Sequence, residues 1–249
     1  MRTSNPALSA KTFIGQSATG TDRMTIGGTV NKSFLLIAIV IAMAYVAWQS
    51  AYPEGWGIET QPIIPPWYFP VIIAALVLSF VIIFKKTTAP MLAPVYAVLE
   101  GLALGALSAI FEARYPGIVM QAVLCTFGTF LALLLAYKSK LIQATENFKL
   151  GVVAATGGIA LVYLIDMGLH FFGHRVPLLH ENGPMGIGIS LFITVIAALN
   201  LVLDFDFIEK GAEQGVPKYM EWYAAFGLLV TLIWLYLEIL SLLGKSRKK

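Results

Sequence analysis

Acidic side chains inside apolar stretches are the residues of this chain whose types could do chemistry. Asp204 and Asp206 follow an apolar run, Ile187–Leu203, in the segment NLVLDFDFIE (Asn200–Glu209). Placing an aspartate at the centre of a membrane helix costs about 2.5–3.5 kcal/mol. Acids found in such a run usually face a bundle interior or a wet cavity. This segment is therefore the first candidate for a functional site.

Three further acids, Glu100, Asp166 and Glu238, lie in other apolar stretches. At 1.5 Å per residue, Asp204 and Glu100 lie about 5–8 Å from the inner ends of their helices, whereas Asp166 and Glu238 lie about 22–24 Å away. This predicts an inner acidic cluster of Glu100 with Asp204 and an outer one of Asp166 with Glu238. Two carboxylates in one desolvated site share a proton and titrate as a pair, which predicts a pH-dependent switch. Calcium prefers six to eight oxygen ligands, so two carboxylates with waters would form only a weak, transient calcium site.

Two further polar residues of the segment Asn200–Glu209 are candidates. Asn200 lies one helical turn before Asp204 on the same face, where it could share the polar environment. Asp206 is turned about 200° from Asp204, so it is expected at the interface, where it would face lipid headgroups or Lys210.

His170 lies four residues after Asp166 on the same helical face, and His174 follows one turn later. This spacing is compatible with a metal site, but it lacks a thiolate and a second histidine cluster on another helix. We therefore expect a hydrogen-bonded Asp166–His170 pair near the outer surface.

The composition indicates a membrane protein. Hydrophobic residues make up 58% of the chain and charged residues only 12%, against about 25% charged in ordinary soluble domains. The net charge of +3 is small, which argues against a nucleic-acid partner. The single cysteine, Cys125, excludes an internal disulfide. Because the chain has no nucleotide-binding loop, activated thiol or HExxH motif, we expect neither an enzyme nor a cofactor.

Seven apolar stretches are long enough, or nearly so, to cross a bilayer as helices. They are Ser33–Gln49, Trp67–Phe84, Val95–Phe111, Ile118–Tyr137, Gly151–Phe172, Ile187–Phe207 and Trp222–Leu243. The sequence therefore predicts an all-α, polytopic integral membrane protein with a seven-helix bundle. Residues 1–32 would form a disordered cytoplasmic tail, residues 33–244 the transmembrane domain and residues 245–249 a basic tail.

Basic residues predict that the N-terminus lies inside the cell. With that orientation the outer loops hold only Arg114 and Arg175, and the remaining basic residues before the last helix lie inside. The tail from Lys245 to Lys249 conflicts with this rule, because seven crossings leave it outside. Either its charges are translocated or the last segment is re-entrant. We favour seven crossings, since Trp222–Leu243 is long enough to span a bilayer.

Two shorter patterns concern packing and loops. Gly101 and Gly105 make a small-residue face at which another helix could approach closely. The segment EKGAEQGVPKYME (Glu209–Glu221) has mixed charge and two glycines, which is typical of a solvated turn.

Several segments together resemble the Bax inhibitor-1 (transmembrane Bax-inhibitor-motif) family, particularly its bacterial branch. The matching pieces are YAVLEGLALG (Tyr96–Gly105), AVLCTFGTFL (Ala122–Leu131), NLVLDFDFIE (Asn200–Glu209), AAFGLLVTLIWLYLEILSLLG (Ala224–Gly244) and the opening RTSNPAL (Arg2–Leu8). The resemblance implies a seven-helix bundle in the cell membrane. It also implies that an aspartate near the end of helix six pairs with one on helix seven, and that protonation of this pair gates a calcium leak.

The resemblance identifies Asp204 as the helix-six aspartate and leaves its partner open. Aligning LYLE with the family's LYLD puts Glu238 at the helix-seven position, whereas an ungapped alignment through Gly244 puts Thr231 there. With Glu238 at that position, the resemblance implies that Asp204 and Glu238 form the weak, transient calcium site. Both share one helical face with Gly227, Trp234 and Ser241, so a polar stripe facing helix six is expected either way.

These observations predict a pH-sensitive calcium or cation leak channel gated by carboxylates on helices six and seven. The alternative is a non-conducting membrane regulator that binds a membrane protease or a stress-response partner. An intramembrane aspartyl protease is disfavoured, because the motifs of those enzymes are absent.

Overall fold

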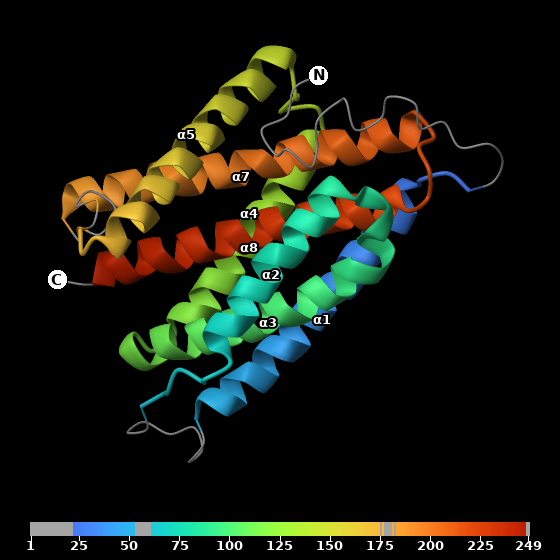
Figure 1. Cartoon of the computed structure of the whole chain (residues 1–249). Coiled ribbons are helices and arrows are strands. Elements are labelled where there is room, and N and C mark those ends of the chain that lie inside the picture. Colours follow the sequence, from blue (N-terminus) through green and yellow to red (C-terminus); the bar gives the residue numbers. More distant parts are fainter. Residues whose placement is uncertain (1–21, 53–60, 175, 177–180, 182, 248–249) are drawn as a thin grey trace. The chain divides into compact units, whose positions relative to one another are not determined.

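The computed structural model describes residues 22–52, 61–174, 176, 181 and 183–247 (Figure 1). These residues form helices and no strand, so the predicted all-α class is confirmed for them. The helices are α1 (Ile26–Ala51), α2 (Tyr68–Phe84), η3 (Lys86–Thr88), α3 (Ala89–Arg114), α4 (Ile118–Lys138), α5 (Glu146–Phe171), α7 (Pro184–Glu213) and α8 (Met220–Arg247).

Six helical segments of the described chain are long and apolar enough to cross a membrane. They correspond to α1, η3 with α3, α4, α5, α7 and α8. The remaining apolar helix, α2, has 17 residues, fewer than the about 20 that a full crossing usually needs. Many large apolar side chains are exposed on α1, α2, α4 and α5, as expected where helices contact lipid.

Several helices extend beyond the apolar stretches that predicted them. α1 begins at Ile26 rather than Ser33, because the Thr25 side chain accepts a hydrogen bond from the Gly28 N–H and caps the first turn. α5 begins at Glu146 for the same reason, with Thr145 as its cap. The predicted tail of residues 1–32 is therefore helical from Ile26, and its residues 1–21 lie outside the described part. Similarly, α8 continues into the predicted basic tail as far as Arg247.

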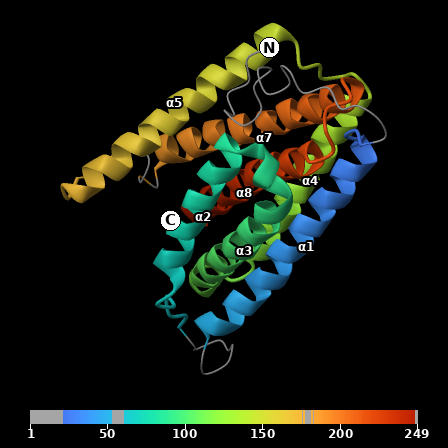
Figure 2. The same ribbon diagram turned by 45° about the vertical axis from the view of Figure 1, so that its right-hand side comes forward.

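The described chain divides into two compact units. Unit 2 comprises residues 22–119 and 207–229 and contains α1, α2 and α3 together with the start of α8. A Cβ on Gly101 would lie 2.6 Å from the Val40 carbonyl oxygen, and one on Gly105 would lie 2.6 Å from the Ala44 Cα. The predicted close approach at Gly101 and Gly105 is thus confirmed. The residue numbers of the two contacting pairs increase in the same direction along both helices, so α1 and α3 are parallel neighbours (Figure 2).

Unit 1 comprises residues 120–206 and 230–247 and contains most of α4, α5, α7 and α8. Side-chain contacts fix the directions of its helices. Lys149 and Thr156 of α5 meet Asp206 and Asn200 of α7, so these two helices are antiparallel. The contacts that make α8 antiparallel to α7 are described below. The end of α8 reaches the start of α4, because Arg247 donates a hydrogen bond to Gln121.

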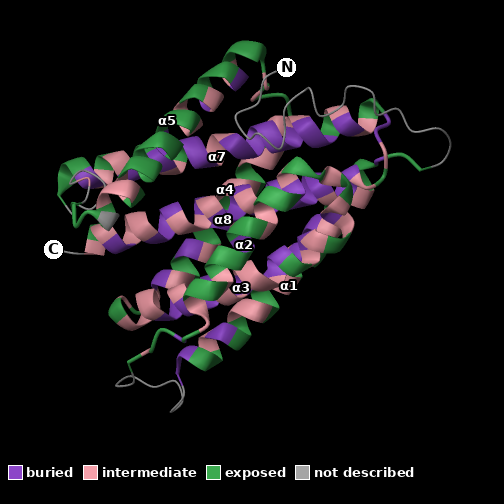
Figure 3. Cartoon of the chain, viewed as in Figure 1, coloured by how far each residue is buried: buried purple, intermediate pink, exposed green. Residues whose placement is uncertain are grey.

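Burial distinguishes α7 and α8 from the other helices (Figure 3). In their most apolar segments 56% and 61% of the residues are buried, against 44% in η3 with α3 and 17% in α1, α4 and α5. Polar side chains on α7 and α8 are therefore largely removed from lipid, which makes these helices the place to look for a functional site.

Candidate functional site

Asp204 of α7 lies against Thr231 of α8. The side chain of Asp204 is 2% exposed and is hydrogen-bonded to the Thr231 side chain, which is itself buried. The second carboxylate oxygen, Oδ2, is buried and has no hydrogen-bond partner among the described residues. A buried polar atom without a partner is uncommon in folded proteins and requires an explanation. A proton, a water molecule or a cation could satisfy it.

The pairing of α7 with α8 shows which helix-eight residue faces Asp204. Lys245 donates a 2.6 Å hydrogen bond to Ser190, and Thr231 is hydrogen-bonded to Asp204. The two contacts are fourteen residues apart on α7 and also fourteen residues apart on α8. The two helices therefore run antiparallel in one constant register. Glu238, seven residues from Thr231, lies about 10 Å further along the axis, near the level of Ala197. Of the two alternatives for the partner of Asp204, the structure places Thr231 there.

Glu238 has its own set of partners. The Tyr163 hydroxyl donates to Glu238 Oε1 at 2.7 Å, and the Trp234 indole N–H donates to the same oxygen at 3.0 Å. Lys245 lies close enough to interact electrostatically with this carboxylate. The tentative calcium site is therefore corrected: Asp204 and Glu238 lie about two helical turns apart and bind different groups.

The predicted outer cluster of Asp166 and Glu238 meets through a third residue. Tyr163 donates to Glu238 and also lies within electrostatic range of Asp166. Asp166 Oδ1 accepts a 2.8 Å hydrogen bond from the backbone N–H of Val176. His170 is exposed. Among the described residues, no group of three or more histidine, cysteine, aspartate or glutamate side chains could hold a metal ion.

Asp206 forms an ion pair that the sequence analysis missed. Its Oδ2 lies 2.8 Å from Lys149 Nζ of α5, and Lys149 is 1% exposed. Asp206 thus faces a buried lysine rather than only lipid headgroups or Lys210. In the sequence, Lys149 was interpreted only as one of the inner basic residues that predict the orientation in the membrane. Its place in the first turn of an apolar helix, four residues after the cap Thr145, is the signal that could have found it.

The remaining polar contacts extend this arrangement along the helices. Asn200 donates a 2.8 Å hydrogen bond to the Thr156 hydroxyl. We call the set the polar ladder. Its members are Lys149, Thr156 and Tyr163 of α5, Ser190, Asn200, Asp204 and Asp206 of α7, and Thr231, Trp234, Glu238 and Lys245 of α8. From Asp206 to Ser190 it covers about 24 Å of α7, a large part of the about 30 Å hydrocarbon thickness.

Glu100, the predicted inner partner of Asp204, belongs to unit 2. There it is hydrogen-bonded to Tyr96 on its own helix and lies near Tyr68 of α2. Because Glu100 and Asp204 belong to different units, their pairing stays a prediction.

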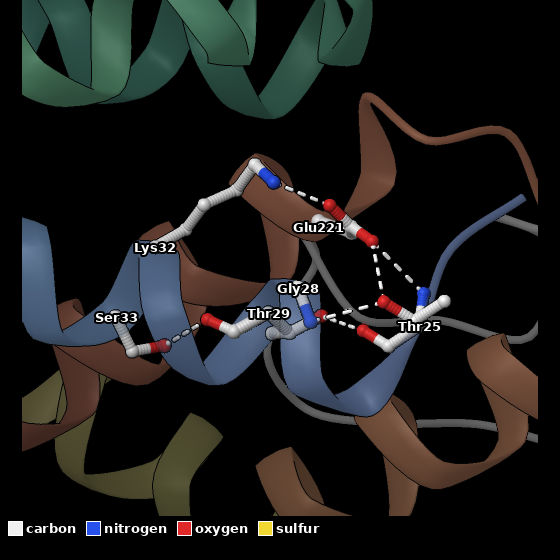
Figure 4. A network of polar contacts seen from close by, with 6 residues as sticks. All are labelled: Thr25, Gly28, Thr29, Lys32, Ser33 and Glu221. Atoms are coloured by element: carbon white, nitrogen blue, oxygen red, sulfur yellow. Dashed lines mark hydrogen bonds and ion pairs between the residues drawn. The ribbon is translucent and has the colours of Figure 1, made fainter. Parts of the chain in front are cut away.

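A second polar cluster, in unit 2, was not predicted. Glu221, in the first turn of α8, is 1% exposed and forms an ion pair with Lys32 of α1 (Figure 4). The same carboxylate accepts hydrogen bonds from the Thr25 N–H at 3.0 Å and the Thr25 hydroxyl at 2.9 Å. Lys32 also lies 5.5 Å from the centre of the Trp222 ring. Glu221 therefore ties the beginning of α1 to the beginning of α8.

This cluster overturns the prediction that Glu209–Glu221 is a solvated turn. α7 continues through Glu213, and Gly215, at φ +61°, reverses the chain. Val216 is buried, and its carbonyl accepts a 2.7 Å hydrogen bond from the Met24 N–H. The turn is packed against the segment that precedes α1.

Comparison with known proteins adds one finding. A protein-family model described as "Bax inhibitor 1 like" matches residues 5–248. Searches of curated proteins and of solved structures gave no match. The family match covers essentially the whole chain, both units included.

Proposed function

The chain belongs to the Bax inhibitor 1 like family, and from this premise we propose that it is a pH-sensitive cation leak whose path follows the polar ladder. The observation that carries the proposal is Asp204, whose buried Oδ2 has no partner among the described residues. A carboxylate on the path is compatible with the passage of either calcium or protons. We propose no catalytic role.

The gating follows from the cost of burying charge. A buried neutral carboxyl group with one unsatisfied atom costs about 1–3 kcal/mol, whereas an ionised one costs more. Loss of the Asp204 proton therefore favours any arrangement that lets water or a cation reach Oδ2. The leak should rise as the pH rises.

The charged groups around Asp204 determine how sharp this response is. Lys149 and Asp206 form an ion pair on the α5 side, and Glu238, Tyr163, Asp166 and Lys245 lie further along the ladder. The lysine stabilises negative charge nearby, and the other acids oppose it. The leak is therefore expected to follow the protonation of Asp204 alone only while Glu238 and Asp206 keep their present partners.

We further propose seven crossings, a cytoplasmic N-terminus and a location in the cell membrane. The basic residues of the inner segments support this orientation. With α2 tilted or locally thinning the bilayer, its 17 residues can cross.

Flux from liposomes tests the leak. Purified protein reconstituted with a calcium dye or a pH dye inside should dissipate an imposed gradient faster at higher pH, and Asp204→Asn should abolish the effect. Glu213→Gln makes the same chemical change at an exposed position of α7 and should leave the flux unchanged. Folded protein that passes neither cation at any pH would refute the leak. That result would favour the alternative, a non-conducting regulator that binds a membrane protease or stress-response partner.

A further inference from the structure

We infer that the ion passed along the polar ladder is the proton rather than a metal cation, and that Thr231 is the residue that sets this selectivity. The inference rests on the proposed leak. It concerns which cation the ladder accepts, and it is carried by the oxygen atoms and charges around Asp204.

The described side chains of unit 1 offer Asp204 few oxygen partners for calcium. Calcium takes six to eight oxygen ligands, and a transit site needs several of them from the protein. The nearest partner across the helix interface is Thr231, which offers one neutral hydroxyl. The closest other acid on α7, Asp206, is held by Lys149 at 2.8 Å. Glu238 is held by Tyr163 and Trp234, about 10 Å further along the axis. Within unit 1, Asp204 is therefore a single carboxylate rather than half of a di-acid site.

A proton needs only a series of donors and acceptors. Hydroxyl groups of the ladder alternate with acids and an amide: Thr231 lies beside Asp204, Thr156 beside Asn200, and Tyr163 beside Glu238. Each hydroxyl can accept one proton while donating another. Water molecules would bridge the steps between these pairs, since each step along α7 or α8 is longer than one hydrogen bond. The unpartnered Oδ2 of Asp204 is the atom that such a water or proton would meet.

The test compares three cations in the same liposomes. Wild-type protein should dissipate a proton gradient without releasing trapped potassium or calcium above the rate of empty liposomes. Thr231→Asp restores a second carboxylate opposite Asp204 and should raise calcium release about tenfold. The matched control is Thr126→Asp on α4, because Thr126 and Thr231 are both 4% exposed and Thr126 bonds only its own helix, at Ala122. This control should release no calcium.

The outcomes separate the inference from the leak itself. Calcium or potassium release by the wild type, lost in Asp204→Asn, would overturn the inference and leave the leak standing. No flux of any cation would overturn both. Proton flux in the wild type without calcium release from folded Thr231→Asp would overturn the role of Thr231. Thr231→Glu, checked with Thr231→Asp for helix content and monodispersity, provides a second carboxylate if the shorter one does not fold.

Discussion

The Glu221 cluster makes the sharpest prediction about stability. Glu221→Gln preserves the shape of the side chain and removes its charge. The amide oxygen can still accept from the Thr25 N–H and hydroxyl, but its NH₂ group would face the ammonium of Lys32, which cannot accept a hydrogen bond. Lys32→Met is the complementary change, because it leaves the buried carboxylate without its cation.

The size of each effect follows from these contacts. Hydrogen bonds to a charged group contribute about 1.5–3 kcal/mol and neutral ones about 0.5–1.5 kcal/mol. Weakening two bonds from Thr25 and losing the ion pair should cost Glu221→Gln about 3 kcal/mol. Lys32→Met should cost about 3–5 kcal/mol, since a buried charge is left unpaired. The double variant should lose little more than Glu221→Gln alone, because its amide no longer needs a cation.

Thermal unfolding in detergent, followed by helix content, measures these losses. For a chain of this size about 1 kcal/mol shifts Tm by about 2–4 °C, so Glu221→Gln should lower Tm by about 6–12 °C. Lys218→Met, an exposed lysine of the same turn, should leave Tm unchanged. If the effects of Glu221→Gln and Lys32→Met simply add within about 0.5 kcal/mol, the two residues do not interact and the reasoning fails.

Three further predictions address helix packing, the ion pair of unit 1 and topology. Gly105→Ala should cost about 1–3 kcal/mol, because the added Cβ meets the Ala44 backbone, whereas Gly128→Ala, with open space around it, should be neutral or stabilising in the same unfolding assay. Lys149→Met and Asp206→Asn should each destabilise by about 3–5 kcal/mol and the pair by clearly less than the sum; additive losses would contradict the ion pair. In a Cys125→Ser background, Ser246→Cys and Lys218→Cys should react with a membrane-impermeant thiol reagent from opposite sides of sealed vesicles. Labelling from one side would mean that α8 does not cross.

Apolar length predicted which segments are helical, and the resemblance identified Asp204, but neither could identify its partner. The prediction measured depth from Phe207 and Trp222, where the apolar runs meet charged residues. In the structure α7 continues to Glu213 and α8 begins at Met220. From these ends Asp204 lies about 14 Å along its helix and Thr231 about 17 Å along its own, so their levels agree. Charged residues such as Glu209 and Lys210 lie on a helix without ending it, and composition alone does not show where such a helix stops.

The packed turn between α7 and α8 was missed for a related reason. Its charges and glycines have the composition of a solvated turn, and nothing local indicates that Glu221 is buried. Its partners, Thr25 and Lys32, lie about two hundred residues earlier in the chain. Long-range polar pairs of this kind leave no periodic pattern in a single sequence, whereas the glycine face of α3 does, because its spacing lies within one helix.

Helix direction bears on the number of crossings. α1 and α3 are parallel neighbours in unit 2, as shown by the paired contacts of Gly101 with Val40 and of Gly105 with Ala44. If both cross the bilayer, the chain must return between them, and α2 is the only described helix long enough to do so. A helix of 17 residues is about 25 Å long, which is a few ångströms short of the hydrocarbon thickness. Such a mismatch costs fractions of a kcal/mol per ångström, far less than leaving the polar ends of α1 or α3 in lipid. Parallel packing of α1 and α3 therefore supports the proposal that α2 crosses the bilayer despite its length.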